Sequence, residues 1–179
     1  HPSVFLEDRW SHGIKAKSPR NDPMENRSEN PALTLVSYGF GAHLAKLACR
    51  ILRTYGVESD VYVLKGPDWN YAGELVEAVH RSKRILFIDL GSPGGSLMNE
   101  MLGEVTQKVR SAVAFDVRVL AIPKSIQPTG YVATQGFYPD LRQILSIAGD
   151  MIGTDFGNEK LPKRPERHDV PNEEFLGPF

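Results

Sequence analysis

The chain of 179 residues contains a single cysteine, Cys49, which excludes an internal disulfide. Cys49 stands among apolar residues at helical spacing, where a small buried side chain is expected rather than a reactive thiol. A protein without disulfides is typical of reducing compartments. We therefore expect a cytoplasmic protein, or one of the mitochondrial or plastid matrix if the source is eukaryotic.

A long hydrophobic run and a dominant charge are also absent. No stretch approaches the roughly 18 consecutive apolar residues that a membrane span needs, and no charged-then-apolar leader opens the chain. The 21 basic and 22 acidic residues are spread along the chain and give a formal net charge of −1. Nucleic acids and anionic membranes attract proteins with a broad basic surface. The sequence thus predicts a soluble protein that binds neither of them, and small molecules and other proteins are left as candidate partners.

Familiar catalytic patterns are missing as well. One cysteine and scattered histidines give no zinc-ligand spacing. The chain has no Gly-x-Ser-x-Gly motif of hydrolases, no Gly-x-Gly-x-x-Gly motif of dinucleotide-binding domains and no P-loop lysine. A serine–histidine–acid triad stays open, because its members meet only in the fold. No catalytic, cofactor-binding or metal-binding residue is predicted in this chain.

Composition divides the chain into three zones. Residues 1–31 hold a short apolar strand and then a polar run, which predicts the end of a preceding domain and a linker. Residues 32–152 alternate β-rich runs with helical periods, as in an α/β domain. Residues 153–179 are rich in charge and proline and predict an extended tail without a core. Because His1 opens a strand-like segment, we expect a processed chain or a fragment.

The central zone is predicted as a three-layer α/β/α domain. The expected strands are residues 33–37, 60–64, 84–88 and 117–122. Four helices are expected from apolar residues at helical spacing: Leu44, Leu47, Ala48, Ile51 and Leu52; Leu75, Val76 and Val79; Leu97, Met101, Val105 and Val109; Leu141, Ile144, Leu145, Ala148 and Ile152. Gly56 is predicted to end the first helix in the left-handed conformation. Ile85, Phe87 and Ile88 form a continuous apolar run that predicts a central strand buried on both faces.

The loop from Asp89 to Ser96 joins this central strand to the next helix. Free amide groups at the start of a helix attract anions, so Gly94, Gly95 and Ser96 are candidates for binding sulfate or phosphate. The alternative is a structural loop, in which the glycines allow a tight turn and Ser96 caps the helix. The structural interpretation is the favoured one.

Two other segments are candidates for contacts. His43 follows the first strand and could contact a ligand at the edge where open α/β sheets bind, although a solvated residue is the simpler interpretation. The segment 123–139 holds Tyr131, Phe137 and Tyr138. Aromatic side chains on such loops often mark subunit interfaces. We therefore predict an interface at these three residues, with packing in the core as the alternative.

The order of these motifs resembles the C-terminal domain of transketolase. The resemblance covers residues 32–152 and rests on Val36-Ser37-Tyr38-Gly39 with the helix after it, residues 56–61, residues 84–89, Gly94-Gly95-Ser96, and Pro128 followed by Tyr138-Pro139-Asp140. Residues 2–10 are similar to the last strand of the pyrimidine-binding domain in beta subunits of 2-oxo acid dehydrogenases, such as those for pyruvate and branched-chain substrates. Among the related families, these beta subunits therefore resemble the chain most.

The resemblance implies a mixed, mostly parallel sheet of about five strands. It also implies that thiamine diphosphate and magnesium bind to other domains of the complete enzyme, so that this chain alone is inactive. Its implied roles are assembly, as a homodimer or with an alpha-type subunit, and docking to a lipoyl acyltransferase core. The alternatives are a stand-alone α/β module that binds a small anionic ligand, and a fragment of transketolase or deoxyxylulose-phosphate synthase.

The chain departs from the family pattern in two places. Val63-Leu64-Lys65 stands where Asp-Leu-Arg usually ends the second strand, and the acid pair common after the third strand is reduced to Asp89. These departures imply a divergent subfamily.

Overall fold

The structure, a computed structural model, describes residues 24–65, 71–92, 94–109, 114–130, 132, 136–157, 161 and 163. Its sheet has the strand order β1-β3-β2-β4-β5. The strands are β1 (Met24–Asn26), β2 (Leu33–Ser37), β3 (Ser59–Val63), β4 (Arg84–Ile88) and β5 (Asp116–Leu120). β2 to β5 run parallel, and β1 pairs antiparallel with β3. The mixed, mostly parallel sheet of about five strands is thus confirmed.

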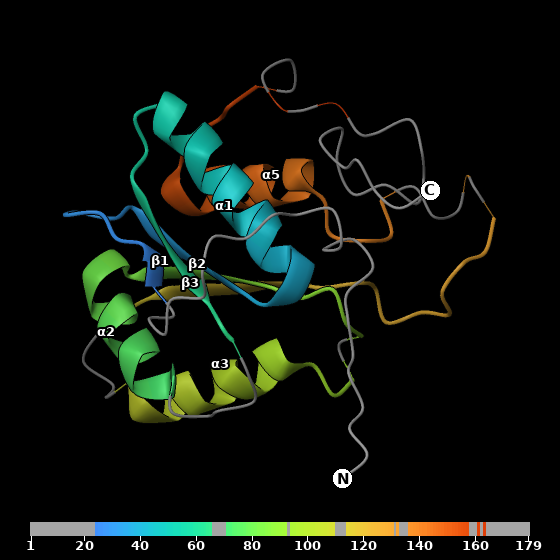
Figure 1. Cartoon of the computed structure of the whole chain (residues 1–179), viewed down its shortest axis with the longest axis horizontal. Coiled ribbons are helices and arrows are strands. Elements are labelled where there is room, and N and C mark those ends of the chain that lie inside the picture. Colours follow the sequence, from blue (N-terminus) through green and yellow to red (C-terminus); the bar gives the residue numbers. More distant parts are fainter. Residues whose placement is uncertain are drawn as a thin grey trace, which may run out of the picture.

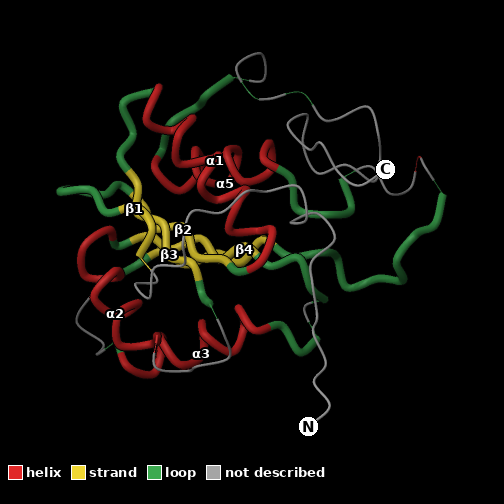
Figure 2. Tube along the Cα trace, viewed as in Figure 1, coloured by secondary structure: helices red, strands yellow, loops and turns green. Residues whose placement is uncertain are grey.

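Among the described residues, two helices cover each face of the sheet. Helices α1 (Gly39–Thr54) and α5 (Leu141–Ile152) pack on one face, and α2 (Tyr71–Ser82) and α3 (Leu97–Lys108) pack on the other (Figures 1 and 2). Each helix buries the stripe of apolar residues that its 3.6-residue period places on one side. The three-layer α/β/α prediction is confirmed.

The middle of the sheet is fully enclosed. Ile85, Phe87 and Ile88 of β4 are all 0% exposed. Alternate side chains of a strand point to opposite faces, so Leu86 and Ile88 join the cluster with α1 and α5, and Ile85 and Phe87 join the cluster with α2 and α3. The prediction of a central strand buried on both faces is therefore confirmed.

Predicted and observed boundaries differ by one or two residues at β3 and β5. The strand expected at 60–64 spans Ser59–Val63, and the one expected at 117–122 spans Asp116–Leu120. β5 ends where its partner does, since its last residue, Leu120, pairs with Ile88, the last residue of β4. The carbonyl of Leu120 accepts from the amide of Asp89 at 2.8 Å. Gly56 has φ +74°, which confirms the predicted left-handed end of α1.

Part of the predicted linker belongs to the sheet. Met24–Asn26 forms β1 at the edge beside β3, although the segment lacks the apolar alternation that predicts a strand. Polar contacts hold it: Nδ2 of Asn26 donates to the carbonyl of Ser59 at 2.6 Å. The segment that precedes residue 24 lies outside the described residues.

A buried ion pair fixes the chain just after β1. Asp60, which is fully buried, accepts from the amide of Ser28 at 2.8 Å and lies 2.8 Å from Nη1 of Arg81. Arg81 also donates to the carbonyl of Ser28. A buried carboxylate requires such partners, so Ser28 and α2 are joined through β3.

The start of the predicted tail is also part of the domain. Phe156 is buried in the cluster with α1 and α5, and its ring centroid lies 5.2 Å from that of Tyr55. The first residues of the segment that composition assigns to the tail therefore contact the core of the domain through Phe156.

Candidate functional site

The carboxyl ends of β2 and β4 form the topological switch point of the sheet. These two strands are neighbours, yet the helices that follow them lie on opposite faces: α1 after β2 and α3 after β4 (Figure 1). The chain therefore diverges between the two strand ends, and open α/β sheets bind their ligands in such a crevice. The candidate functional site is built from the residues that end these strands.

Hydrogen bonds join the two strand ends across this crevice. The hydroxyl of Tyr38 donates to Oδ1 of Asp89 at 2.7 Å, and the hydroxyl of Ser37 donates to the carbonyl of Ile88 at 2.7 Å. The two sequence segments that were separate candidates, the turn after β2 and the loop after β4, are thus brought together.

Asp89 is the centre of this cluster and is 0% exposed. Its Oδ1 accepts from the hydroxyl of Tyr38 and from the amide of Gly91, both at 2.7 Å. Its Oδ2 accepts from the hydroxyl of Ser96 and, at 3.5 Å, from the amide of Met98 in the first turn of α3. A carboxylate near a helix N-terminus is stabilised by the free amides there. The chain's own carboxylate therefore lies beside the first turn of α3, bonded to the hydroxyl of Ser96 and to the amide of Met98.

The backbone around the cluster approaches closely. A Cβ atom on Gly41 would lie 2.3 Å from Oγ of Ser37, and one on Gly91 would lie 3.0 Å from Oδ1 of Asp89. A larger residue at position 41 would displace the side chain of Ser37, and one at position 91 would push the carboxylate of Asp89 by a few tenths of an ångström. The two glycines are required by the cluster.

The candidate anion-binding residues divide into two groups. Ser96 is buried and caps α3, since its hydroxyl accepts from the amide of Asn99 at 3.2 Å. Gly94 and Gly95 are exposed, and Gly95 has φ +89°. The capping role expected for Ser96 is thus present, and binding of an external anion at the glycines stays a prediction.

His43 belongs to α1, the helix that follows Tyr38. It is half-buried in the second turn of α1, where its ring centroid lies 5.5 Å from that of Phe40. A role at the ligand edge stays a prediction.

The predicted interface residues lie at different depths. Phe137 is only 8% exposed in the single chain, and its ring meets that of Tyr138 edge-on with centroids 5.3 Å apart. The half-buried Tyr138 accepts from the side-chain amide of Gln127. Tyr131 lies outside the described residues. Phe137 thus has little surface left to bury against another chain.

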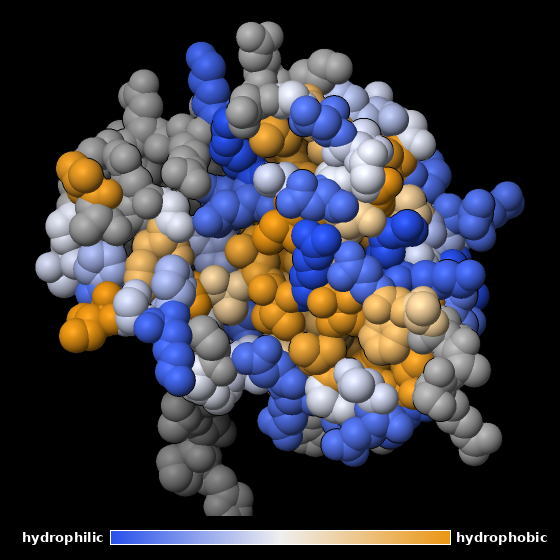
Figure 3. Space-filling view, turned by 180° about the vertical axis from the view of Figure 1, so that it is seen from behind, coloured by the Kyte–Doolittle hydropathy of each residue, from blue (hydrophilic) through white to orange (hydrophobic). Residues whose placement is uncertain are grey.

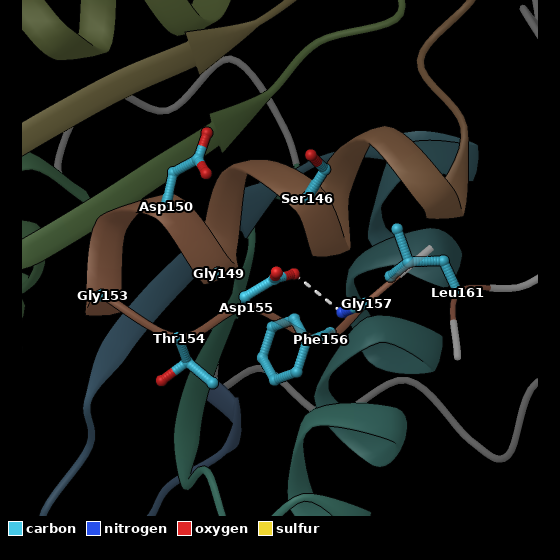
Figure 4. Close-up of a pocket in the computed structure, with 9 residues that line it drawn as sticks. All are labelled: Ser146, Gly149, Asp150, Gly153, Thr154, Asp155, Phe156, Gly157 and Leu161. Carbon is cyan, nitrogen blue, oxygen red and sulfur yellow. Dashed lines mark hydrogen bonds between the residues drawn. The ribbon is translucent and has the colours of Figure 1, made fainter. Parts of the chain in front are cut away.

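A cavity that the sequence did not predict lies at the end of α5. It has a volume of about 580 Å³ and is lined by Ser146, Gly149, Asp150, Gly153, Thr154, Asp155, Phe156, Gly157 and Leu161 (Figure 4). Asp155 accepts from the amide of Gly157 at 2.8 Å and so shapes its wall. The signal in the sequence is the lone Phe156 between glycines, in a segment that composition assigns to the tail.

Thiamine diphosphate and magnesium, which the resemblance implies for the complete enzyme, require oxygen ligands for the metal and donors for the diphosphate. No group of three or more His, Cys, Asp and Glu side chains in the described part of the chain could hold a metal ion. The amide of Met98 in the first turn of α3 already donates to Asp89. Within the same residues, every helix is too short or too polar to span a bilayer.

Comparisons with known proteins agree with this architecture. No protein-family model matches the chain. The chain is 20% identical over 153 residues to the beta subunit of acetoin:2,6-dichlorophenolindophenol oxidoreductase from Cupriavidus necator, a match that covers 82% of this chain and 45% of that protein. The chain thus spans less than half the length of this curated relative.

Two solved structures share the fold. A split-gene transketolase, solved as an inactive beta4 tetramer, superposes with a TM-score of 0.63 at 13% identity, covering 78% of this chain and 45% of that one. The 2-oxoglutarate:ferredoxin oxidoreductase of Magnetococcus marinus gives a TM-score of 0.52 at 10% identity, covering 75% and 20%. The chain is an α/β domain in which the Tyr38–Asp89 hydrogen bond joins the two strand ends at the switch point. Its fold is that of a transketolase C-terminal-like domain, which confirms the resemblance drawn from the sequence.

Proposed function

We propose that this chain is the C-terminal domain of a thiamine-diphosphate-dependent 2-oxo acid dehydrogenase of the beta-subunit type. Its role is assembly and partner docking, and it is not catalytic by itself. The fold supports this class, and so does the similarity to a protein named as a beta subunit. Cofactor binding and catalysis belong to other domains of the complete enzyme.

The observation that carries the non-catalytic role is the bridge between Tyr38 and Asp89. It spans the crevice where open α/β sheets bind ligands. Asp89 is fully buried and its two oxygens contact four donors. A group that serves as general base must reach the proton that it abstracts. Asp89 is instead used to hold two loops and a helix together.

Calorimetry tests this role directly. We expect no heat of binding when thiamine diphosphate with magnesium is titrated into the chain, and no turnover of pyruvate or branched 2-oxo acids. A micromolar dissociation constant for the cofactor would contradict the proposal. Heat on titration of inorganic phosphate alone, lost in a Gly95→Ala variant, would instead favour a stand-alone module that binds an anion.

The partners in this proposal are a second copy of the chain, an alpha-type subunit and the lipoyl acyltransferase core. The assembly role predicts that the chain sediments as a dimer or co-elutes with a co-expressed alpha-type subunit during size-exclusion chromatography. A chain that stays monomeric at high concentration, both alone and with that subunit, would contradict it.

A further inference from the structure

In the part of the chain that the structure describes, the outer side of β5 is an open edge of the sheet. Among the described residues, no strand pairs with it. All five residues of β5 are half-buried, whereas all five of β2 are buried. The opposite edge is short and irregular, because β1 has three residues and a shift of register. An open edge offers its N–H and C=O groups to another chain, so β5 is the better site for adding a strand.

The bonds between β5 and β4 show which residues face the open edge. The amide of Asp116 donates to the carbonyl of Lys83 at 2.9 Å, and the carbonyl of Leu120 accepts from Asp89 at 2.8 Å. Backbone groups of alternate residues point to the same side of a strand. Even-numbered residues of β5 therefore bond to β4, and odd-numbered residues, with Val117 at the centre, direct their N–H and C=O groups to the open edge.

This alternation restricts how two copies of β5 could pair. In an antiparallel pair about a two-fold axis, residues with outward backbone groups must stand opposite one another. The two-fold axis must therefore pass beside one residue of β5, which then stands opposite the same residue of the second copy. Within the part of the strand that carries charge, the allowed positions are Asp116, Val117, Arg118 and Val119.

Charge selects one of these positions. An axis at Asp116 or at Arg118 places like charges directly opposite each other, which is destabilising. An axis at Val119 places both charged residues opposite apolar ones. An axis at Val117 places Asp116 opposite Arg118 of the second copy, twice by symmetry. Both side chains are 40% exposed and therefore accessible for these contacts.

Apolar side chains match in the same register. Val117 stands opposite Val117 of the second copy, and Phe115 stands opposite Val119 of the second copy. All these side chains lie on the face that packs against α2 and α3. These three side chains are half-exposed in the single chain. The side of the molecule toward which β5 and α5 lie carries a hydrophobic area across its middle, crossed by hydrophilic side chains (Figure 3). Burying such area favours association.

We propose that two copies of this chain pair through β5, antiparallel about a two-fold axis at Val117, so that one sheet continues across both. This rests on the proposed assembly function and names the surface that performs it. In the single chain, Arg118 lies 3.3 Å from Asp116. An exposed pair of this kind contributes little to stability, so its larger role is to set the partner and the register.

A charge-exchange experiment on the full chain tests the pairing. Asp116→Arg gives an edge with two positive charges, and Arg118→Asp gives one with two negative charges. By sedimentation velocity we expect wild type to dimerise, and each single variant to dimerise at least tenfold more weakly. A one-to-one mixture of the two variants should recover the dimer, because each arginine of the first variant then stands opposite an aspartate of the second. Mixing cannot restore the pair within one chain, so recovery reports contact between chains.

Disulfide trapping tests the register. At the axis, two copies of a Val117→Cys variant have Cα atoms about 5.5 Å apart, within reach of a disulfide. Two copies of Val119→Cys are separated by four residues of strand, or about 13 Å. Mild oxidation should link the first variant and not the second, and native Cys49 is buried.

The results that would contradict the pairing through β5 differ from those that would contradict the assembly role. Pairing through β5 is overturned if the mixture stays monomeric, if both cysteine variants link equally, or if wild type is a monomer. A wild-type dimer whose charge variants also dimerise would overturn only the β5 pairing and leave the assembly role intact. Circular dichroism of each variant shows whether the domain is folded. If Val117→Cys does not fold, the mixture of charge variants decides.

Discussion

Tyr38 and Asp89 are 51 positions apart in the sequence, and the hydroxyl of Tyr38 donates to Oδ1 of Asp89 at 2.7 Å. This bond joins the carboxyl ends of two neighbouring strands, and the other oxygen of Asp89 reaches the start of α3. One carboxylate therefore connects both layers of helices at the point where the sheet would otherwise be open.

Removing the Tyr38 hydroxyl should destabilise the domain. Tyr38→Phe keeps the ring and leaves a buried carboxylate with one donor fewer, which costs about 1–3 kcal/mol of unfolding free energy. Urea denaturation measures this difference. Tyr71→Phe is the matched control, because the bond that the hydroxyl of Tyr71 accepts from the amide of Lys65 is long, at 3.4 Å, and exposed. Equal losses in the two variants would show that the bridge is not the cause.

Removing the Asp89 carboxylate should create an anion site. In an Asp89→Ala variant, the donors that faced Asp89 lose their acceptor, and phosphate can replace it. We expect phosphate to raise the melting temperature of this variant and to leave that of wild type unchanged, since a ligand stabilises the state that binds it. Glu29→Ala, which removes an exposed carboxylate outside β5, controls for net charge. A rise in wild type would instead support the anion site predicted at Gly94 and Gly95.

Much of the fold could be predicted because its signals are local. Helices α1 and α5 are indicated by apolar residues every three or four positions, and β4 by a continuous apolar run. β1 could not be predicted from Met24-Glu25-Asn26, since it is held by polar contacts to β3 rather than by an apolar face. The burial of Phe156 was missed for a related reason, because a single apolar residue after α5 forms no periodic pattern in the sequence.

The sequence predicted the two parts of the candidate site but not the contact between them. The turn at Tyr38 and the loop at Asp89 were each recognisable as strand-to-helix connections. Their contact depends on β2 lying beside β4 rather than only beside β3, and strand order is a property of the whole chain. The anion candidates Gly94, Gly95 and Ser96 belong to the same loop, and the sequence did not reveal that Asp89 would bond to the hydroxyl of Ser96 and to the amides of Gly91 and Met98.

Truncating the buried side chain of Phe87 should destabilise the domain. Phe87→Ala leaves a cavity between β4 and the helices α2 and α3, which should lower the unfolding free energy by about 3–5 kcal/mol. Ile126→Ala is the control, because Ile126 is 95% exposed, and a change within about 0.5 kcal/mol is expected there. Denaturant melts of the two variants should therefore differ clearly; similar melts would mean that Phe87 is not enclosed.

Phe137 should affect stability rather than association. Its side chain is buried in the single chain, so Phe137→Ala should cost about 3 kcal/mol of unfolding free energy and leave the sedimentation of the folded protein unchanged. The opposite result, a variant of normal stability that no longer dimerises, would place the interface at the aromatic loop as first predicted and away from β5.

Tyr62 should make the domain sensitive to alkaline pH. Burial, and next the negative charge of Asp60, raise the pKa of Tyr62 from 10.0 to about 12. The folded state therefore holds this proton more tightly than the unfolded state does. The resulting stabilisation is fully present below pH 10 and is lost as the pH rises from about 10 to about 12. Tyr62→Phe removes the titrating group, so its unfolding free energy should fall less steeply than that of wild type over this range.

Urea melts at about pH 9, 10 and 11 measure the two slopes, and Tyr55→Phe, an exposed position at the end of α1, should parallel wild type. Identical slopes for wild type and Tyr62→Phe would mean that the hydroxyl of Tyr62 is accessible to solvent.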